Sequence, residues 1–295
     1  MNKYKILGTC FVLLTLLTNV GCNRDPYLPT GPATYIELGG DGRFGGDNDG
    51  QSLLNTIRVM TYNIHACEPP SKPDTTDIGA IAQAIRNGNP DIVFLQEVDK
   101  GTNRNGYTGD QAKEIADLLN MNYYFYAARN YLRGFYGVAI LSKYPISDIK
   151  RNNLTKENDA TEQRVLGTAM VDFPGIDSAI IAVTHLQHNS ATNRLQQVRD
   201  IVNILGNKSD RIIIGGDFNE QESATDFFNI FDGTFTRTCV GSNCAKTFSA
   251  QNPTSVIDYL AYRPASAFSV NSHSIVSEFY ASDHLPVVAE LKFNR

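Results

Sequence analysis

Residues 211–219 read RIIIGGDFN: three consecutive isoleucines and two glycines lead directly to Asp217 and Asn219. A short β-branched run that ends in glycines is typical of a buried strand. Such a strand delivers both polar side chains to its carboxyl end, where a rigid backbone can hold them in a defined arrangement. This stretch therefore predicts a buried strand with a polar site at its end.

Three more apolar runs lead into polar residues in the same way. They precede Asn63, Glu97 and His185, so that four strands bring an amide, two carboxylates and an imidazole to their ends. Each residue alone has a structural explanation, because Glu97 could meet solvent at a strand end and His185 could be a buried structural imidazole. The combination favours a functional site over these separate explanations.

The apolar runs after residue 56 are short and regularly spaced. The runs with strand character are 57–62, 92–96, 138–141, 168–173, 179–184, 211–215, 257–261 and 287–291. Helical patterns follow Asp77 and Asp110 and cover residues 195–205, and we expect the first helix to stop at Gly88. Because helices and strands are mixed without a dividing linker, residues 56–295 are predicted to form one α/β domain.

The N-terminal segment differs in composition from the rest. Two lysines precede an apolar stretch over residues 6–20, which is short for a membrane span and indicates a signal peptide over residues 1–21. An uncleaved anchor or a buried helix is the alternative. The small residue before Cys22 resembles a bacterial lipobox. We therefore expect an exported lipoprotein, in the periplasm or at the cell surface, that contacts the membrane through a lipid on Cys22.

Residues 22–55 are rich in Gly, Pro, Asp and Asn, which predicts a flexible tether between membrane and domain. Farther along the chain, Cys239 and Cys244 bracket a turn-forming Val-Gly-Ser-Asn. In an oxidising compartment these two residues could form a disulfide, and two free thiols are the alternative. Cys67 has no obvious partner.

The chain has 295 residues and a formal net charge of −5. This acidic balance argues against a domain that binds long nucleic acid through bulk positive charge. It does not exclude a phosphate site, because a bound cation can meet the substrate instead. We therefore expect a monomer for which long nucleic acid is not a favoured partner.

The polar residues at the strand ends suit an oxygen-preferring metal. Carboxylate and amide oxygens favour Mg²⁺ or Mn²⁺, and the set lacks the Cys cluster or neighbouring His pair typical of zinc. Asp258 lies in an apolar run and needs a buried partner, either a histidine or a metal. Asp283 and His284 could cap a turn, but an imidazole beside acids also suits proton transfer. The set predicts metal-assisted hydrolysis of a phosphate ester.

Seven motifs in this chain resemble the endonuclease/exonuclease/phosphatase superfamily and occur in that family's order. They are TYNIH (61–65), LQEVD (95–99), YGVAILSKYPI (136–146), THLQH (184–188), GDFNE (216–220), IDYL (257–260) and SDHLPVVAEL (282–291). The resemblance covers essentially all of residues 57–295. It implies a four-layer α/β/β/α sandwich, with two packed, mostly antiparallel sheets and helices outside, and it implies a phosphoesterase that needs a divalent cation.

The resemblance also implies a set of metal ligands. Glu97 is expected to be the main Mg²⁺ (or Mn²⁺) ligand, with help from Asn63 and Asp283. Two departures from the family pattern bear on metal or substrate preference. Val138 stands where many relatives have Asn, and His65 stands where some nucleases carry Asp.

Catalytic roles carry over in the same way. Asp217 and Asn219 are expected to orient the attacking water and a phosphoryl oxygen. His284, braced by Asp258, resembles the general base or an acid that contacts the phosphate. His185 is expected to stabilise the phosphoryl oxygens or to protonate the leaving group.

Three arginines are candidate phosphate clamps: Arg104, Arg164 and Arg194. A solvated or salt-bridged arginine is the alternative for each. Arg164 is favoured because its Glu-Gln-Arg context resembles a Glu-x-Arg position in the secreted bacterial branch of the family.

The function predicted from these features is hydrolysis of a phosphodiester. Nucleic acid, a phospholipid or sphingolipid head group and a small sugar or inositol phosphate all stay open as substrates, so an extracellular nuclease and a sphingomyelinase-like enzyme are both alternatives. The rivals outside enzymes are a catalytically silent binding module with the same fold and a structural lipoprotein.

Overall fold

The computed structural model describes residues 34–37, 41–46, 50–175 and 177–295. The predicted signal peptide over residues 1–21 and the lipid site predicted at Cys22 lie outside these ranges. Part of the predicted tether, residues 22–55, lies inside them and contacts the domain. Strand β1 pairs with β6, and Nη1 of Arg43 donates a 2.7 Å hydrogen bond to Asp117.

Two sheets form the centre of the described domain. The seven-stranded sheet has the order β1-β6-β7-β8-β9-β11-β10, and the six-stranded sheet has the order β12-β13-β2-β3-β5-β4. The strands are β1 (Thr34–Glu37), β2 (Thr56–Asn63), β3 (Ile92–Lys100), β4 (Asn122–Tyr131), β5 (Gly134–Ser142), β6 (Ile146–Asn153), β7 (Val165–Phe173), β8 (Asp177–His185), β9 (Ile212–Asp217), β10 (Thr236–Arg237), β11 (Asp258–Arg263), β12 (Phe268–Ile275) and β13 (Val287–Phe293).

Most neighbouring strands are antiparallel, as predicted. The exceptions among the described strands are β2–β3 and β8–β9, which are parallel. A parallel pair needs a crossover connection, and α1 and α3 supply these two crossovers. Each sheet therefore contains one β-α-β unit.

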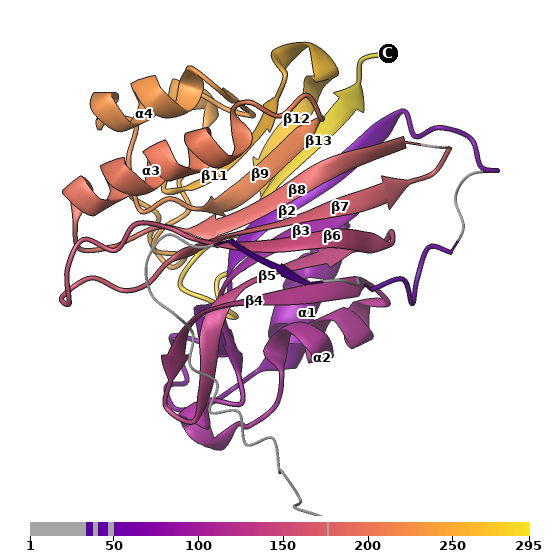
Figure 1. The fold of residues 1–295 in the computed structure, drawn as a ribbon. Helices are drawn as coiled ribbons and strands as arrows, with labels where there is room; N and C mark the ends of the chain where they lie inside the picture. Colours follow the sequence, from indigo (N-terminus) through magenta and orange to yellow (C-terminus); the bar gives the residue numbers. More distant parts are fainter. Residues whose placement is uncertain (1–33, 38–40, 47–49, 176) are drawn as a thin grey trace, which may run out of the picture.

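Helices cover the outer face of each sheet. The helices are α1 (Ile78–Gly88), α2 (Gln111–Leu119), α3 (Ala191–Leu205) and α4 (Thr225–Asp232). Figure 1 shows α3 and α4 together beside the seven-stranded sheet and α1 and α2 together on the opposite side of the molecule. The predicted four-layer α/β/β/α sandwich is confirmed.

Alternation along the strands explains the layers. Val59 and Phe94 belong to the core between the sheets, whereas Met60 and Val93 belong to the core beneath α1 and α2. In the other sheet, Ile213 faces the central core, and residues on either side of it pack under α3 and α4. Both faces of these strands are buried, which is why they read as continuous apolar runs in the sequence.

The starts of α1 and α2 agree with the sequence, whereas α3 begins at Ala191, before the predicted range, and α4 was not predicted. The side chains of Asp77 and Asp110 accept the N-cap hydrogen bonds of α1 and α2. Helix α1 stops at Gly88, as predicted, and the left-handed conformation that follows the helix is adopted by Asn89, with φ 45°. A Cβ atom on Gly88 would lie 2.2 Å from Cε of Met60, so this glycine permits close packing on β2.

None of the described helices is both long and apolar enough to span a membrane.

Candidate active site

The carboxyl ends of β2, β8 and β9 meet where the two sheets come together. They place Asn63, His185 and Asp217 there. Nδ2 of Asn63 donates hydrogen bonds of 3.0 Å to Oε1 of Glu97 and to Oδ2 of Asp217. Because Glu97 belongs to the six-stranded sheet and Asp217 to the seven-stranded one, this single amide joins the two sheets at the site.

Strand register aligns three site residues within the seven-stranded sheet. Asp217 is opposite His185 in the parallel pair β8–β9 and opposite Asp258 in the antiparallel pair β9–β11. Nε2 of His185 lies 3.5 Å from Oδ2 of Asp217. The pairing of three adjacent strands therefore sets this row of titratable groups.

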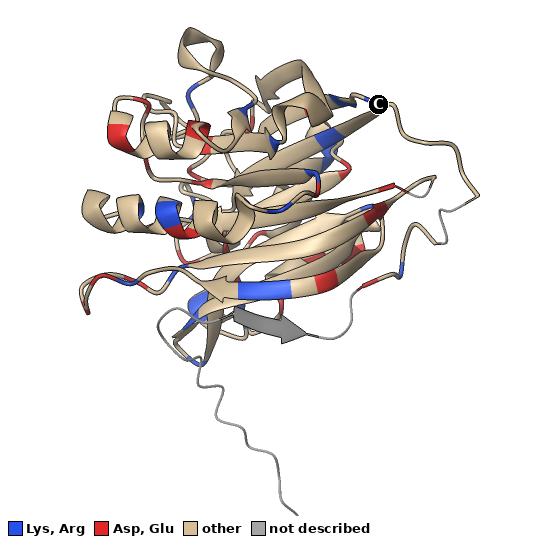
Figure 2. Ribbon diagram, turned by 45° about the horizontal axis from the view of Figure 1, so that its top comes forward, with Lys and Arg blue, Asp and Glu red and all other residues tan. Residues whose placement is uncertain are grey.

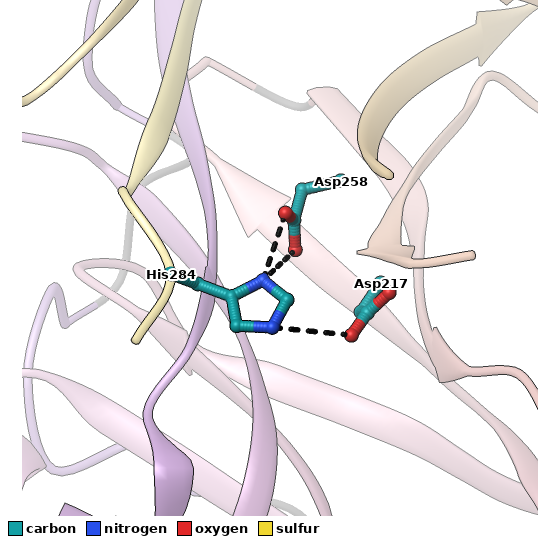
Figure 3. A group of neighbouring side chains, drawn as sticks. All are labelled: Asp217, Asp258 and His284. Atoms are coloured by element: carbon teal, nitrogen blue, oxygen red, sulfur yellow. Dashed lines mark hydrogen bonds and ion pairs between the residues drawn. The ribbon is translucent and has the colours of Figure 1, made fainter. Parts of the chain in front are cut away.

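His284 reaches into the row from the loop that precedes β13. Figure 3 shows its imidazole between the carboxylates of Asp258 and Asp217. Nδ1 lies 2.9 Å from Oδ2 of Asp258, and Nε2 lies 3.7 Å from Oδ2 of Asp217. All three residues are at least 96% buried, so they compensate one another's charge in place of water. The structure thus brings together the predicted pair of His284 and Asp258.

The surroundings of His284 favour its protonated form. Burial alone would lower the pKa of His284, but the negative charges of Asp258, Asp217 and Asp283, with the hydrogen bond to Asp258, raise that pKa well above its ordinary value. Burial and the charge of Asp258 raise the pKa of Asp217, while His284 and the hydrogen bond from Asn63 oppose this rise. At neutral pH the proton therefore resides on His284.

His185 is held in the opposite state. Burial lowers the pKa of His185 well below its ordinary value, and the positive charges of Arg164 and His284 lower it further. Nδ2 of Asn219 lies 3.0 Å from Nε2 of His185, and the Asn219 backbone N–H donates a 2.8 Å hydrogen bond to Oδ1 of Asp217. The site therefore contains one neutral and one charged imidazole, a division that suits separate proton-transfer roles.

Glu97 is placed by a β-bulge, which corrects the predicted strand boundary. The apolar run 92–96 was expected to end at Glu97, but β3 continues to Lys100, and its pairing with β5 shifts register between Leu95 and Val98. Glu97 adopts φ 57° within the bulge, an uncommon conformation for a non-glycine residue. A bulge re-aims a side chain without ending the strand, and here it turns Glu97 toward Asn63.

The donor set fits a hard divalent cation. Glu97 is half-buried, and its carboxylate has lone pairs beyond the one that accepts the hydrogen bond from Asn63. Asp283 is linked to Asn63 through Ser282, whose Oγ donates to the backbone carbonyl of Asn63 at 2.7 Å and to Oδ1 of Asp283 at 3.4 Å. Oxygen atoms of Asp217 and Asp258 and a nitrogen of His284 also lie within 4.8 Å of one another and make a second candidate group. Both groups are rich in carboxylate, as Mg²⁺ or Mn²⁺ would require.

A family model agrees with this arrangement. The model of the endonuclease/exonuclease/phosphatase family matches residues 60–284, which span every site residue described so far. The chain belongs to this family. Members of the endonuclease/exonuclease/phosphatase family are for the most part metal-dependent phosphoesterases and nucleases.

Individual relatives extend over most of the chain. The uncharacterized protein YbhP of Escherichia coli K12 is 26% identical over 255 residues, covering 82% of this chain and 98% of YbhP. An endonuclease/exonuclease/phosphatase structure from Beutenbergia cavernae superimposes with a TM-score of 0.69 at 24% identity, over 82% of this chain and 72% of that one. The mannosyl-6-phosphatase Bt3783 of Bacteroides thetaiotaomicron gives a TM-score of 0.61 at 18% identity, over 80% of this chain and all of that one.

The three predicted phosphate clamps differ in their surroundings. Arg194 pairs with Glu220 at 2.8 Å and donates to two backbone carbonyls, so it holds the loop after β8. Arg104 pairs with the buried Asp99 at 2.8 Å. Arg164 is buried and adds positive charge at His185. Of the three, Arg164 is the one whose charge acts on the site row, and the substrate contacts of all three stay predictions.

Two further residues support the site and were missed in the sequence. Thr247 is fully buried, and its Oγ1 donates a 2.5 Å hydrogen bond to Oδ2 of Asp258. The ring of Phe248 lies 4.9 Å from the ring of His284 and is 37% exposed. Thr247 and Phe248 come ten or more positions before Asp258 in a loop without a periodic pattern, so no sequence signal pointed to them.

The loop that leads to Thr247 is closed by a disulfide between Cys239 and Cys244. The pairing that the sequence left open is therefore present. Glu222 accepts hydrogen bonds from the backbone N–H of Gly241 inside this loop. Cys67 is a free, buried thiol.

Proposed function

We propose that this protein hydrolyses phosphodiesters with the help of Mg²⁺ or Mn²⁺. The observation that carries the proposal is the buried row in which His284 bridges Asp258 and Asp217, with Asn63 linking Asp217 to Glu97. A structural protein has no need for buried charges that are costly to desolvate. A hydrolase needs such groups in order to orient water and to move a proton.

Glu97, Asn63 and Asp283 are the residues that would hold the cation, Asn63 through Oδ1, which accepts a 3.1 Å hydrogen bond from the backbone N–H of His65. Asp258 and His284 are already bound to each other, so a cation among Asp217, Asp258 and His284 would have to disrupt their ion pair. When bound, the cation would neutralise negative charge that develops on the phosphoryl oxygens. We therefore place the cation at Glu97 and Asp283 and not among Asp217, Asp258 and His284.

The remaining residues transfer protons or position the substrate. The Oδ2 atom of Asp217 is available to orient a water and to accept its proton. Charged His284, fixed by Asp258, contacts the substrate through Nε2 and donates the Nε2 proton to the oxygen of the leaving group, which balances the proton that Asp217 takes from the water. Neutral His185, close to Asn219, contacts a phosphoryl oxygen. Each role uses the protonation state that the surroundings impose.

A sugar phosphatase is the second candidate function. The observation in its favour is the fold shared with Bt3783, whose name states mannosyl-6-phosphatase activity. A monoester carries one more negative charge than a diester and would draw more on Arg164. Substrate comparison separates the two candidates.

The test is a panel of phosphate esters supplied with Mg²⁺. It contains bis(p-nitrophenyl) phosphate, p-nitrophenyl phosphate, DNA, RNA, sphingomyelin, phosphatidylinositol phosphates and sugar phosphates. Faster turnover of the diesters that EDTA abolishes supports the proposal. Exclusive turnover of monoesters supports the sugar phosphatase, and the absence of any turnover supports a silent binding module.

His284→Ala tests the proton-transfer role within the same panel. Removal of a positioned acid–base group costs about 10²–10⁴-fold in rate. A loss smaller than tenfold on the preferred substrate would argue against a central role for His284.

A further inference from the structure

Two arginines from different sheets share one carboxylate beside the site. Nη2 of Arg129, on β4, lies 3.0 Å from Oε1 of Glu162, and Nη2 of Arg164, just before β7, lies 3.0 Å from Oε2 of the same residue. Glu162 thus bridges the two guanidinium groups. One negative charge facing two positive charges leaves a local excess of positive charge.

Aromatic rings hold one of these guanidinium groups in place. The guanidinium carbon of Arg129 lies 4.6 Å from the ring centre of Tyr131 and 4.9 Å from that of Tyr136. Arg104 stacks on the same two rings and is neutralised by Asp99. Stacked arginines keep their N–H donors in a fixed fork and lose little entropy when they bind an anion.

Each of the two arginines has an N–H donor without a partner among the described residues. The Nε atoms of Arg129 and Arg164 are buried and have no hydrogen-bond partner within the described chain. The side chains of Arg129 and Glu162 are 27% and 29% exposed, so a ligand can reach the outer part of the cluster. Arg164 is only 3% exposed and anchors the inner part.

This cluster adjoins the catalytic row. Nη2 of Arg164 lies 3.4 Å from Nδ1 of His188, three positions after His185. Burial is the main cause of the lowered pKa of His185, and the positive charges of Arg164, His188 and Arg129 lower this pKa further. Figure 2 shows Lys and Arg interspersed with Asp and Glu over the ribbon.

We propose that Arg129 and Arg164 bind a second phosphate group, carried by the same substrate molecule as the phosphate that is cleaved. Glu162 pairs with the Nη2 atoms of both arginines at rest and competes with that second phosphate, which reaches the cluster from the exposed side of Arg129. Arg129 is thereby a specificity-determining residue for substrates with two phosphates. The inference names a substrate class for the proposed hydrolase and rests on that function.

A purely structural ion pair is the competing explanation, and it predicts the opposite response at Glu162. If Glu162 only holds the arginines, its neutralisation loosens them and weakens anion binding. If Glu162 competes with a phosphate, its neutralisation strengthens binding, because the carboxamide of Glu162→Gln keeps the shape and removes the repelling charge.

The experiment compares the binding of glucose 6-phosphate and glucose 1,6-bisphosphate, which differ by one phosphate. Isothermal titration calorimetry of the full domain in EDTA prevents metal-dependent turnover of either probe. We expect the wild type to bind the bisphosphate about tenfold more tightly than the monophosphate. Arg129→Gln should reduce this preference to about twofold, and Glu162→Gln should increase it about fivefold.

Arg86→Gln is the matched control, because Arg86 is an exposed arginine on α1 and should leave the preference unchanged. Thermal melting of each variant reports folding. Equal affinity of the wild type for the two probes, or a Glu162→Gln preference below that of the wild type, overturns the inference. Turnover of diesters with Mg²⁺ is scored separately, so failure of the hydrolase proposal and failure of the second phosphate site are distinguishable.

Discussion

Glu97 and Asp258 are both carboxylates at the junction of the two sheets, yet the protein holds them in opposite ways. Asp258 is 2% exposed and is bound by His284 and by the hydroxyl of Thr247. Glu97 is half-buried, sits on a bulge with positive φ and accepts a hydrogen bond from Asn63. The carboxylate of Asp258 is therefore fully occupied by protein partners, whereas the carboxylate of Glu97 has lone pairs that can still bind a cation.

The difference indicates a division of labour within one small site. A buried carboxylate whose partners are fixed can set the charge and direction of an imidazole. A carboxylate that keeps free lone pairs can bind a cation that arrives from solvent. We therefore assign cation binding to the Glu97 side and proton positioning to the Asp258 side, and the predictions below separate the two.

Glu97→Gln should have the largest effect. The substitution keeps the size of the side chain but removes the negative charge that attracts the cation, and we expect about a 10³-fold loss of turnover, or ~4 kcal/mol of transition-state stabilisation. Turnover at saturating Mg²⁺ measures the loss, and circular dichroism checks the fold. Glu290→Gln, at a surface pair with Arg58, is the control. Unchanged turnover in Glu97→Gln would overturn the site assignment.

Asp258→Asn should have the next largest effect, about 10²-fold on kcat. The amide cannot stabilise a charged imidazole, so the pKa of His284 should fall toward its ordinary value. The pH dependence of kcat reports this change, and the apparent affinity for Mg²⁺ should stay within about threefold of the wild type. A large rise in the Mg²⁺ requirement would show that the two sides are not separate.

Thr247→Val should cost about tenfold in kcat. It removes one hydrogen bond to Asp258 while preserving the shape of a buried side chain, and a buried acceptor that loses its partner costs on the order of 1–3 kcal/mol. Thr254→Val, at an exposed position in the same loop, is the control. Equal losses in the two variants would mean that Thr247 acts through loop stability alone.

Loss of the disulfide should have the smallest effect on turnover. For so short a loop, chain entropy predicts that Cys239→Ser with Cys244→Ser lowers the free energy of unfolding by roughly 2 kcal/mol. Because Thr247 is also held by backbone hydrogen bonds to Ser255 and Leu285, we expect kcat to fall by less than about threefold. Urea unfolding and steady-state kinetics of the same preparation check both values. A tenfold loss of kcat would place the disulfide loop within the machinery that positions Asp258.

Much of the fold was predictable because its strands are buried on both faces. The run of isoleucines in β9 and the Asp caps of α1 and α2 are local signals, and local signals survive in the sequence. By contrast, β12 reads FSVNSHSI and is largely exposed at the edge of its sheet, so no apolar period marks it.

The site was predictable to the extent that strand ends define it. Asn63, His185 and Asp217 lie where their apolar runs stop, and the family motifs supplied Asp258 and His284. The bulge at Glu97 was not predictable, because a register shift depends on the partner strand β5 and leaves the apolar period of β3 unchanged.

The contacts across sheets were also beyond the sequence. Arg129 meets Glu162 only because β4 and the start of β7 come together in the folded domain, and Thr247 reaches Asp258 through a loop without periodicity. Such pairs depend on tertiary packing, which composition and spacing do not record.

The most direct test of the division of labour is Mn²⁺ binding by calorimetry to the wild type, Glu97→Gln and Asp258→Asn. Our assignment predicts that Glu97→Gln weakens Mn²⁺ binding at least about 30-fold, while Asp258→Asn binds within about threefold of the wild type. The opposite pattern, with Mn²⁺ affinity lost in Asp258→Asn and kept in Glu97→Gln, would place the cation among Asp217, Asp258 and His284 and contradict the assignment.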